Sequence, residues 1–194
     1  MSLFQVYLRT FLFYLLFSFP VLANVDLLGN ELGGISELSE NQAQVYLAHS
    51  TAGQVTINQQ GGQVGNPNQA FVGQTGYGNE ATINQTGSGN TAKVVQLGVK
   101  NDANIKQDGF DNTALIVQSG LFNSATIEQS GNGNNAYIGQ VGLGQDEYLS
   151  QTGGENTFAF VDKKGVSYSG YNVQQTGGET LLILNGMNAT FNVY

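Results

Sequence analysis

The sequence predicts an all-β fold, a cross-β β-solenoid of two facing parallel sheets built from 11-residue strand-turn units, with about 22 residues per coil. Three observations predict it. A glutamine recurs every 11 residues, a glycine follows it two positions later, and constant apolar residues alternate with variable ones ahead of it. The glutamines are Gln63, Gln74, Gln85, Gln96, Gln107, Gln118, Gln129, Gln140 and Gln151. Such a period marks one structural unit stacked on copies of itself, which indicates a structural protein rather than an enzyme.

Each unit begins with a strand of five residues. In the unit Ala81-Thr82-Ile83-Asn84-Gln85, the Ala, Ile and Gln are two residues apart, so they share one face of the strand. The residues between them vary from unit to unit, which is typical of a strand with one buried face. The predicted core residues of this aliphatic column are Val72, Ile83, Val94, Ile105, Ile116, Ile127, Ile138 and Leu149.

The rest of each unit is a turn. Glycine supplies positive φ without steric cost, and asparagine tolerates positive φ while its side chain bonds nearby backbone. The turn glycines are Gly76, Gly87, Gly98, Gly109, Gly120, Gly131 and Gly142, with Gly65 and Gly153 at the two ends. The turn asparagines are Asn79, Asn90, Asn101, Asn112, Asn123 and Asn134, with Asn68 and Asn156 at the two ends. Five strand residues and a tight turn account for the 11-residue period.

Stacking gives the amide columns a structural role. A buried amide without a partner costs roughly 1–3 kcal/mol, whereas a Gln above another Gln can donate to one neighbour and accept from the other. The Gln column is therefore expected to form a ladder that sets the register, and the Asn column is expected to do the same at the turns. No amphipathic capping helix is evident at either end of the repeats, so the solenoid is expected to add further copies of itself and grow into a fibre.

The N-terminus is predicted to be a secretory signal peptide, residues 1–23. Arg9 precedes an apolar run from Phe11 to Leu22, and the run is too short to span a bilayer of roughly 30 Å. Residues 24–42 are expected to be a flexible, loosely attached leader, and residues 43–194 the repeats, irregular from about residue 157.

Some units depart from the pattern. Glu147 stands at an Ala position, which would direct a carboxylate towards the core, and Gln145 stands at an Asn position. After Gln151 we expect the inward residues to follow two series. The first is Ala159, Val161 and Lys163, and the second is Tyr171, Val173 and Gln175. Lys163 would break the ladder because an ammonium group cannot accept a hydrogen bond.

The composition excludes several functions. The chain has no cysteine and one histidine, His49, so we expect neither a His/Cys metal site nor a Ser-His-Asp triad, and no cofactor is indicated. Lys and Arg total 6 against 14 Asp and Glu, which does not suit nucleic acid. An ice-binding protein would need a regular outward Thr array, but outward residues such as Lys93 and Leu115 interrupt Thr82 and Thr126.

These residues resemble the repeats of the curlin family, the subunits of curli, an extracellular functional amyloid of Gram-negative bacteria. The family repeat is close to Q-x-G-x-G-N-x-A-x-x-x-Q. Residues 74–85, 85–96 and 129–140 match it fully, and the resemblance covers about residues 43–194. The A-x-I-x-Q-x-G form of most units is similar to the minor, nucleator subunit, the type that we favour slightly. The ending Asn188-Ala189-Thr190-Phe191-Asn192-Val193-Tyr194 is similar to the major one.

The resemblance implies a secreted subunit of a cell-surface fibre that supports adhesion and biofilm formation. It implies as partners other curlin subunits, an outer-membrane secretion pore, a periplasmic chaperone, and host or abiotic surfaces. The alternative is a monomeric β-solenoid that serves as a surface adhesin or an ice-binding module.

Overall fold

The computed structural model describes residues 32–36, 41–63, 65–162, 170–184 and 190–193. This described part contains fifteen β-strands. They are β1 (Leu32–Ser36), β2 (Gln42–Thr51), β3 (Gln54–Gly61), β4 (Gln69–Tyr77), β5 (Glu80–Ser88), β6 (Thr91–Val99), β7 (Asp102–Phe110), β8 (Thr113–Leu121), β9 (Ser124–Asn132), β10 (Asn135–Leu143), β11 (Asp146–Gly154), β12 (Thr157–Asp162), β13 (Gly170–Thr176), β14 (Thr180–Leu184) and β15 (Thr190–Val193).

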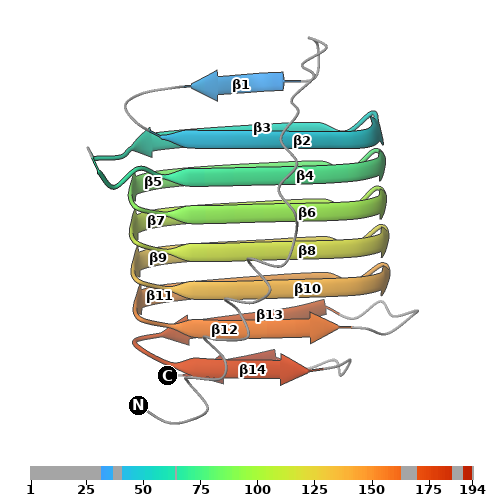
Figure 1. The fold of residues 1–194 in the computed structure, drawn as a ribbon. Coiled ribbons are helices and arrows are strands. Elements are labelled where there is room, and N and C mark those ends of the chain that lie inside the picture. Colours follow the sequence, from blue (N-terminus) through green and yellow to red (C-terminus); the bar gives the residue numbers. More distant parts are fainter. Residues whose placement is uncertain (1–31, 37–40, 64, 163–169, 185–189, 194) are drawn as a thin grey trace.

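The strands form two parallel sheets that face each other. Sheet A has the order β1-β3-β5-β7-β9-β11-β13-β15, and sheet B has the order β14-β12-β10-β8-β6-β4-β2. Each strand therefore hydrogen-bonds to the strand two places along the chain, as successive coils of a solenoid require (Figure 1). The predicted β-solenoid of two facing parallel sheets is confirmed.

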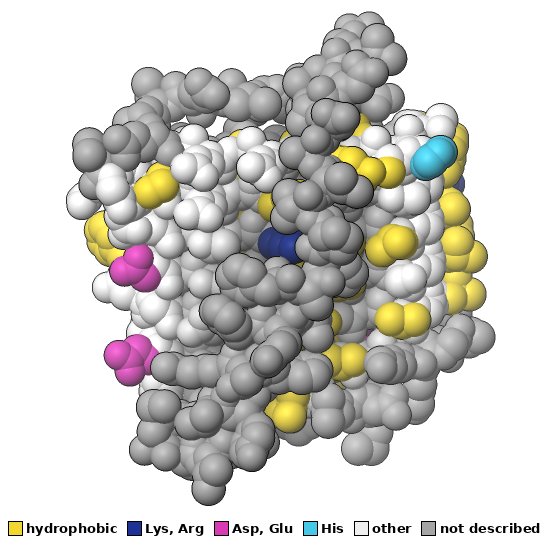
Figure 2. Space-filling view, in the orientation of Figure 1, with side chains coloured by type: hydrophobic (Ala, Val, Ile, Leu, Met, Phe, Trp, Pro, Cys, Tyr) yellow, Lys and Arg dark blue, Asp and Glu magenta, His cyan; other side chains and the backbone are white. Residues whose placement is uncertain are grey.

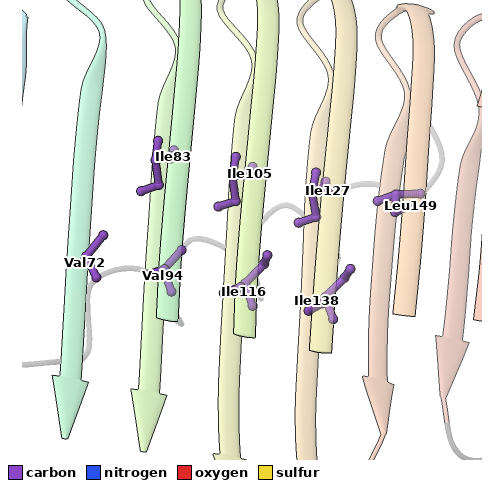
Figure 3. Packing of buried hydrophobic residues seen from close by; sticks show 14 of the residues in the cluster. Val72, Ile83, Val94, Ile105, Ile116, Ile127, Ile138 and Leu149 are labelled. Carbon is purple, nitrogen blue, oxygen red and sulfur yellow. The ribbon is translucent and has the colours of Figure 1, made fainter. Parts of the chain in front are cut away.

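The register between coils keeps like residues together. In sheet A, Ile83 is the Cα partner of Ile105, and Ile105 is the partner of Ile127, at steps of 22 residues. The inward Ala and aliphatic side chains of both sheets form one buried cluster between them. Figure 3 shows the aliphatic side chains as two facing rows, with Val72, Val94, Ile116 and Ile138 in one and Ile83, Ile105, Ile127 and Leu149 in the other.

The turn glycine is required by both backbone conformation and space. Gly98 has a φ of +120°, and a Cβ added there would lie 2.0 Å from the carbonyl oxygen of Gly120 in the next coil. Two positions further on, the turn accepts other residues at positive φ, since Lys100 has a φ of 53° and Phe122 a φ of 56°. The asparagine that follows does not have positive φ, contrary to the prediction for the Asn column, because the residue before it makes the turn.

The structure corrects the predicted register of β12. Phe158, Phe160 and Asp162 face inward, at the positions of Ala136, Ile138 and Gln140 in the preceding coil. Ala159 and Val161 belong to a separate apolar cluster outside the sandwich, and Lys163 lies outside the described residues. A shift by one residue exchanges the two faces of a strand, and here it buries two aromatic rings rather than two small side chains.

The remaining irregular units are also placed. Tyr171, Val173 and Gln175 of β13 lie inward as predicted, opposite Glu147, Leu149 and Gln151. The segment 24–42, predicted to be a flexible leader, includes β1, which pairs in parallel with β3. The predicted signal peptide, residues 1–23, lies outside the described residues.

The turn geometry predicts unequal effects of one substitution at two glycines. Gly98→Ala should lower the free energy of unfolding by more than about 3 kcal/mol, because the new methyl group would push adjacent coils apart. Gly133→Ala should cost roughly 1–2 kcal/mol, because its φ of +67° is strained for alanine but its Cβ would meet only Glu155 Cγ, 3.9 Å away. Guanidinium titrations followed by β-sheet circular dichroism would measure both, and equal losses would contradict the close-approach argument.

Candidate functional site: the amide ladders

The inward face of each regular strand ends in a buried glutamine. This residue follows the Ala and aliphatic positions at the spacing of two, so strand alternation directs its amide into the same interior. Gln85, Gln107 and Gln129 of sheet A are each at most 2% exposed, although their side chains are polar. Such burial is tolerated only where the amide groups find hydrogen-bond partners.

The glutamines of each sheet form a continuous hydrogen-bonded chain, in which each Nε2 donates to the Oε1 of the glutamine one coil further on. In sheet A the donor–acceptor distances are 2.8 Å for Gln59 to Gln85, 2.8 Å for Gln85 to Gln107, 2.9 Å for Gln107 to Gln129, 2.8 Å for Gln129 to Gln151 and 2.8 Å for Gln151 to Gln175. In sheet B they are 2.8 Å for Gln74 to Gln96, 2.9 Å for Gln96 to Gln118 and 2.8 Å for Gln118 to Gln140.

The second hydrogen of each amide bonds to backbone at the edge of the facing sheet. Gln85 Nε2 donates to the carbonyl oxygens of Gln69 and Asn90, at 3.0 and 3.1 Å. Because these acceptors are carbonyls, they determine which atom of the amide is the nitrogen and so the direction of the ladder. The glutamine ladder therefore ties successive coils together and also ties each sheet to the strand entering the other.

The asparagines form a second pair of ladders at the turns. Asn112 Nδ2 donates to Asn90 Oδ1 in the preceding coil at 3.1 Å and to the Gly131 carbonyl at 2.8 Å. Its Oδ1 accepts from the backbone N–H and the Nδ2 of Asn134, at 3.1 and 3.0 Å. The same contacts recur at the other turn asparagines. The linked pairs are Asn68–Asn90, Asn79–Asn101, Asn101–Asn123 and Asn134–Asn156.

Gln63 is not part of the ladder in which the sequence analysis placed it. It is exposed, its backbone N–H donates to Ser88 Oγ at 3.1 Å, and it forms an antiparallel bridge with Asn66. Gln59 occupies the ladder position instead, because it stands opposite Gln85. The sequence signal was present: Val55-x-Ile57-x-Gln59-x-Gly61 repeats the inward pattern, and Gln63 belongs to the insertion that follows.

At each end of the sheet B ladder, a residue other than glutamine occupies the next position in the column. At the N-terminal end Leu47 stands opposite Gln74, so the buried Oε1 of Gln74 has no hydrogen-bond partner within the described part of the chain. At the other end Asp162 follows Gln140 in the column. The sheet A ladder continues further, and its last amide, Gln175 Nε2, donates to the carbonyls of Thr157 and Glu179, both at 3.3 Å.

A buried carboxyl group lies close to the end of the sheet B ladder. Glu147 is 3% exposed, and neither of its oxygens has a hydrogen-bond partner among the residues that the structure describes. Burial raises the pKa of Glu147 from 4.5 to about 9, with further contributions from the negative charges of Asp162 and Asp146. The side chain is therefore protonated in the folded chain at neutral pH. Its neighbours in the same column are Ala125 and Tyr171, which offer no positive charge to stabilise a carboxylate.

Other kinds of site are not evident in the part of the chain that the structure describes. There, no three His, Cys, Asp or Glu side chains cluster closely enough to hold a metal ion. Among those same residues, no helix has the length and hydropathy to cross a membrane. The candidate functional feature of the molecule is therefore the set of four amide ladders, two of glutamine and two of asparagine.

The ladder geometry predicts which positions matter for assembly. Replacing Gln85 and Gln129 by Ala should slow fibre formation at least about tenfold, because each change leaves the amides above and below without partners, at roughly 1–3 kcal/mol each. The matched control replaces Thr82 and Thr126, which face outward on the same two strands, by Ala. Thioflavin fluorescence would follow both variants, and similar rates would contradict a role for the ladder.

The burial of Glu147 predicts that the free energy of unfolding depends on pH. Its pKa is raised in the folded state, so its contribution is fully present below about pH 4.5 and is lost as pH rises towards about 9. Over this window the free energy of unfolding should fall by roughly 1 kcal/mol per pH unit in the wild type. Denaturant midpoints between pH 5 and 9 should show this slope flattened in Glu147→Gln. The exposed Glu155→Gln serves as the control and should keep the wild-type slope.

Comparison with known proteins agrees with this geometry. A family model described as the Curlin associated repeat matches residues 65–98, 100–121 and 122–153, which include β4 to β10 apart from Val99, and most of β11. No curated protein and no solved structure matches the chain. The matched segments contain most of the glutamines and asparagines that form the ladders, together with the turn glycines. The regular repeats of this chain, over residues 65–153, are therefore of the curlin type.

Proposed function

We propose that this chain is a secreted structural subunit of a curli-like amyloid fibre, which grows at the cell surface when coils of one subunit stack on coils of the next. The curlin repeats suggest a curli amyloid subunit. The observation that carries the proposal is the pair of glutamine ladders, in which each regular coil repeats the hydrogen bonds of the coil before it.

The sheet edges support stacking. Among the described strands, β2 and β14 stand at the two ends of sheet B, and each pairs with a strand on one side only. An unpaired parallel edge offers a row of N–H and C=O groups to another chain. A second subunit in the same register would continue the backbone ladder at about 4.8 Å per coil.

The polarity of the ladders supports head-to-tail growth. In both ladders the glutamine Nε2 donates towards the C-terminal coils, so the two ends of a stack differ. Two like ends would bring donors against donors or acceptors against acceptors. Head-to-tail addition pairs donors with acceptors, and such a heterologous interface produces an open filament rather than a closed dimer.

The proposal extends to location and role. Cleavage after Ala23 would release the chain for export, and the family resemblance supports passage through an outer-membrane pore with help from a periplasmic chaperone. Fibres at the surface would then support adhesion to host or abiotic surfaces and biofilm formation. We favour the nucleator type slightly, on the A-x-I-x-Q-x-G form of its units.

Seeded growth tests the proposed function. Residues 24–194 should convert to thioflavin-positive fibres, and preformed fibres should remove any lag, because an exposed coil templates the next subunit. Growth without a lag would favour the nucleator type over the major one. A solution that stays monomeric for days, with or without seeds, would contradict the proposal and favour a monomeric surface adhesin.

A further inference from the structure

The two sides of the solenoid differ in charge. The strands of sheet A and the turns that follow them carry most of the acids in the described part of the chain. These acids include Glu80, Asp102, Asp108, Asp111, Glu128, Asp146 and Glu155. The corresponding residues of sheet B, 69–79, 91–101, 113–123 and 135–145, carry Lys93 and Lys100 as their only charges. Because the strands of the two sheets alternate along the chain, acids that recur every 22 residues gather on one side of the solenoid, and the other side in these four coils has none.

Apolar side chains gather where the strands of sheet B end. Tyr77, Leu97, Leu121, Phe122 and Val141 are between 42% and 54% exposed. Together with Val99 and Leu143 they form what we call the apolar ridge. Tyr77, Val99, Leu121 and Leu143 are Cα partners in successive coils, so the ridge runs along the stacking direction. Figure 2 shows it as hydrophobic side chains along the right edge, opposite an edge with acidic ones.

The opposite edge does not have such a ridge. The equivalent positions, where the strands of sheet A end, are Ser88, Phe110, Asn132 and Gly154, again stacked in register. Phe110 is 49% exposed and is the one large apolar residue of this column. The repeat pattern therefore does not demand apolar residues at this turn position, and their accumulation on one edge needs another explanation.

We propose that the apolar ridge pairs two stacks side by side, the partner being the same ridge on a second copy of this chain. The inference rests on the proposed fibre and goes beyond it to the lateral contact. Because ridge residues recur at the strand spacing, a second stack with the same spacing matches them over any length. The chain has a net charge of -8, and the sheet B side lets two copies approach with their acids turned away from each other.

The size of the ridge makes the pairing depend on stacking. Four strands at about 4.8 Å spacing give a strip on the order of 20 Å long, which buries a few hundred Å² per subunit. A stable dimer needs about 800 Å² per partner. Single subunits therefore stay unpaired, whereas two stacks share a contact that lengthens with every subunit added.

Mass per unit length of the fibres tests the proposal. Scanning transmission electron microscopy of fibres grown from the full-length chain should give a value twice that of a single stack. The double variant Tyr77→Glu, Leu121→Glu should halve it, because the added carboxylates repel across the contact. The control Phe110→Glu places one such carboxylate at the same repeat position on the other edge and should leave the value unchanged.

Other results would overturn the proposal. Wild-type fibres with the mass per length of a single stack would do so whatever the variants show, and so would an equal loss in the Phe110→Glu control. If the ridge variant keeps paired stacks but no longer floats with phosphatidylglycerol vesicles that the wild type binds, the ridge faces lipid instead. Complete failure of the wild type to form fibres would refute the proposed function itself.

Discussion

A buried amide that must find hydrogen-bond partners is the constraint on which the rest of this structure depends. Gln107 is 1% exposed, and its partners at 2.8 and 2.9 Å are the glutamines one coil away on either side. A shift of one residue in strand register would turn this amide to the surface and replace it with an outward residue. The parallel pairing, the 22-residue step and the alignment of apolar columns all follow from keeping these amides paired.

The ladders also connect the two sheets and give the stack a direction. Each Gln amide reaches a carbonyl at the start of a strand in the facing sheet, as Gln85 does with Gln69, so the thin apolar core is closed by hydrogen bonds at its side. The glutamine and asparagine ladders donate in opposite directions, since Gln107 donates to Gln129 while Asn112 donates to Asn90. The sheet B ladder ends at Leu47 and Asp162, and Glu147 departs from the pattern in the Ala column of sheet A.

The sequence alone predicts the repeated part well because both of its periods are visible in the residue types. The period of 2 is the alternation along each strand, and the period of 11 is the length of each unit. The predictions are wrong where a residue of the expected type does not occupy the expected structural position, or where an unexpected type does. Gln63 keeps the 11-residue spacing from Gln74 but lies in an insertion, and only the Val55-x-Ile57-x-Gln59 alternation identifies the true ladder residue. In β12 the position 22 residues after Ala136 is Phe158, and its unusual size concealed the continued register. The apolar ridge was missed because it repeats every 22 residues, so averaging all units together hides it.

Solid-state NMR of fibres labelled at the glutamine side-chain nitrogens and carbons would test the central claim most directly. The account predicts rigid Nε2 signals in cross-polarisation spectra. It also predicts contacts from each Nε2 to the side-chain carbonyl carbon of a glutamine in the next coil, including contacts that cross between subunits. Mobile glutamine side chains in exchange with water, seen alongside an intact cross-β backbone, would contradict it and leave register to backbone pairing and apolar packing alone.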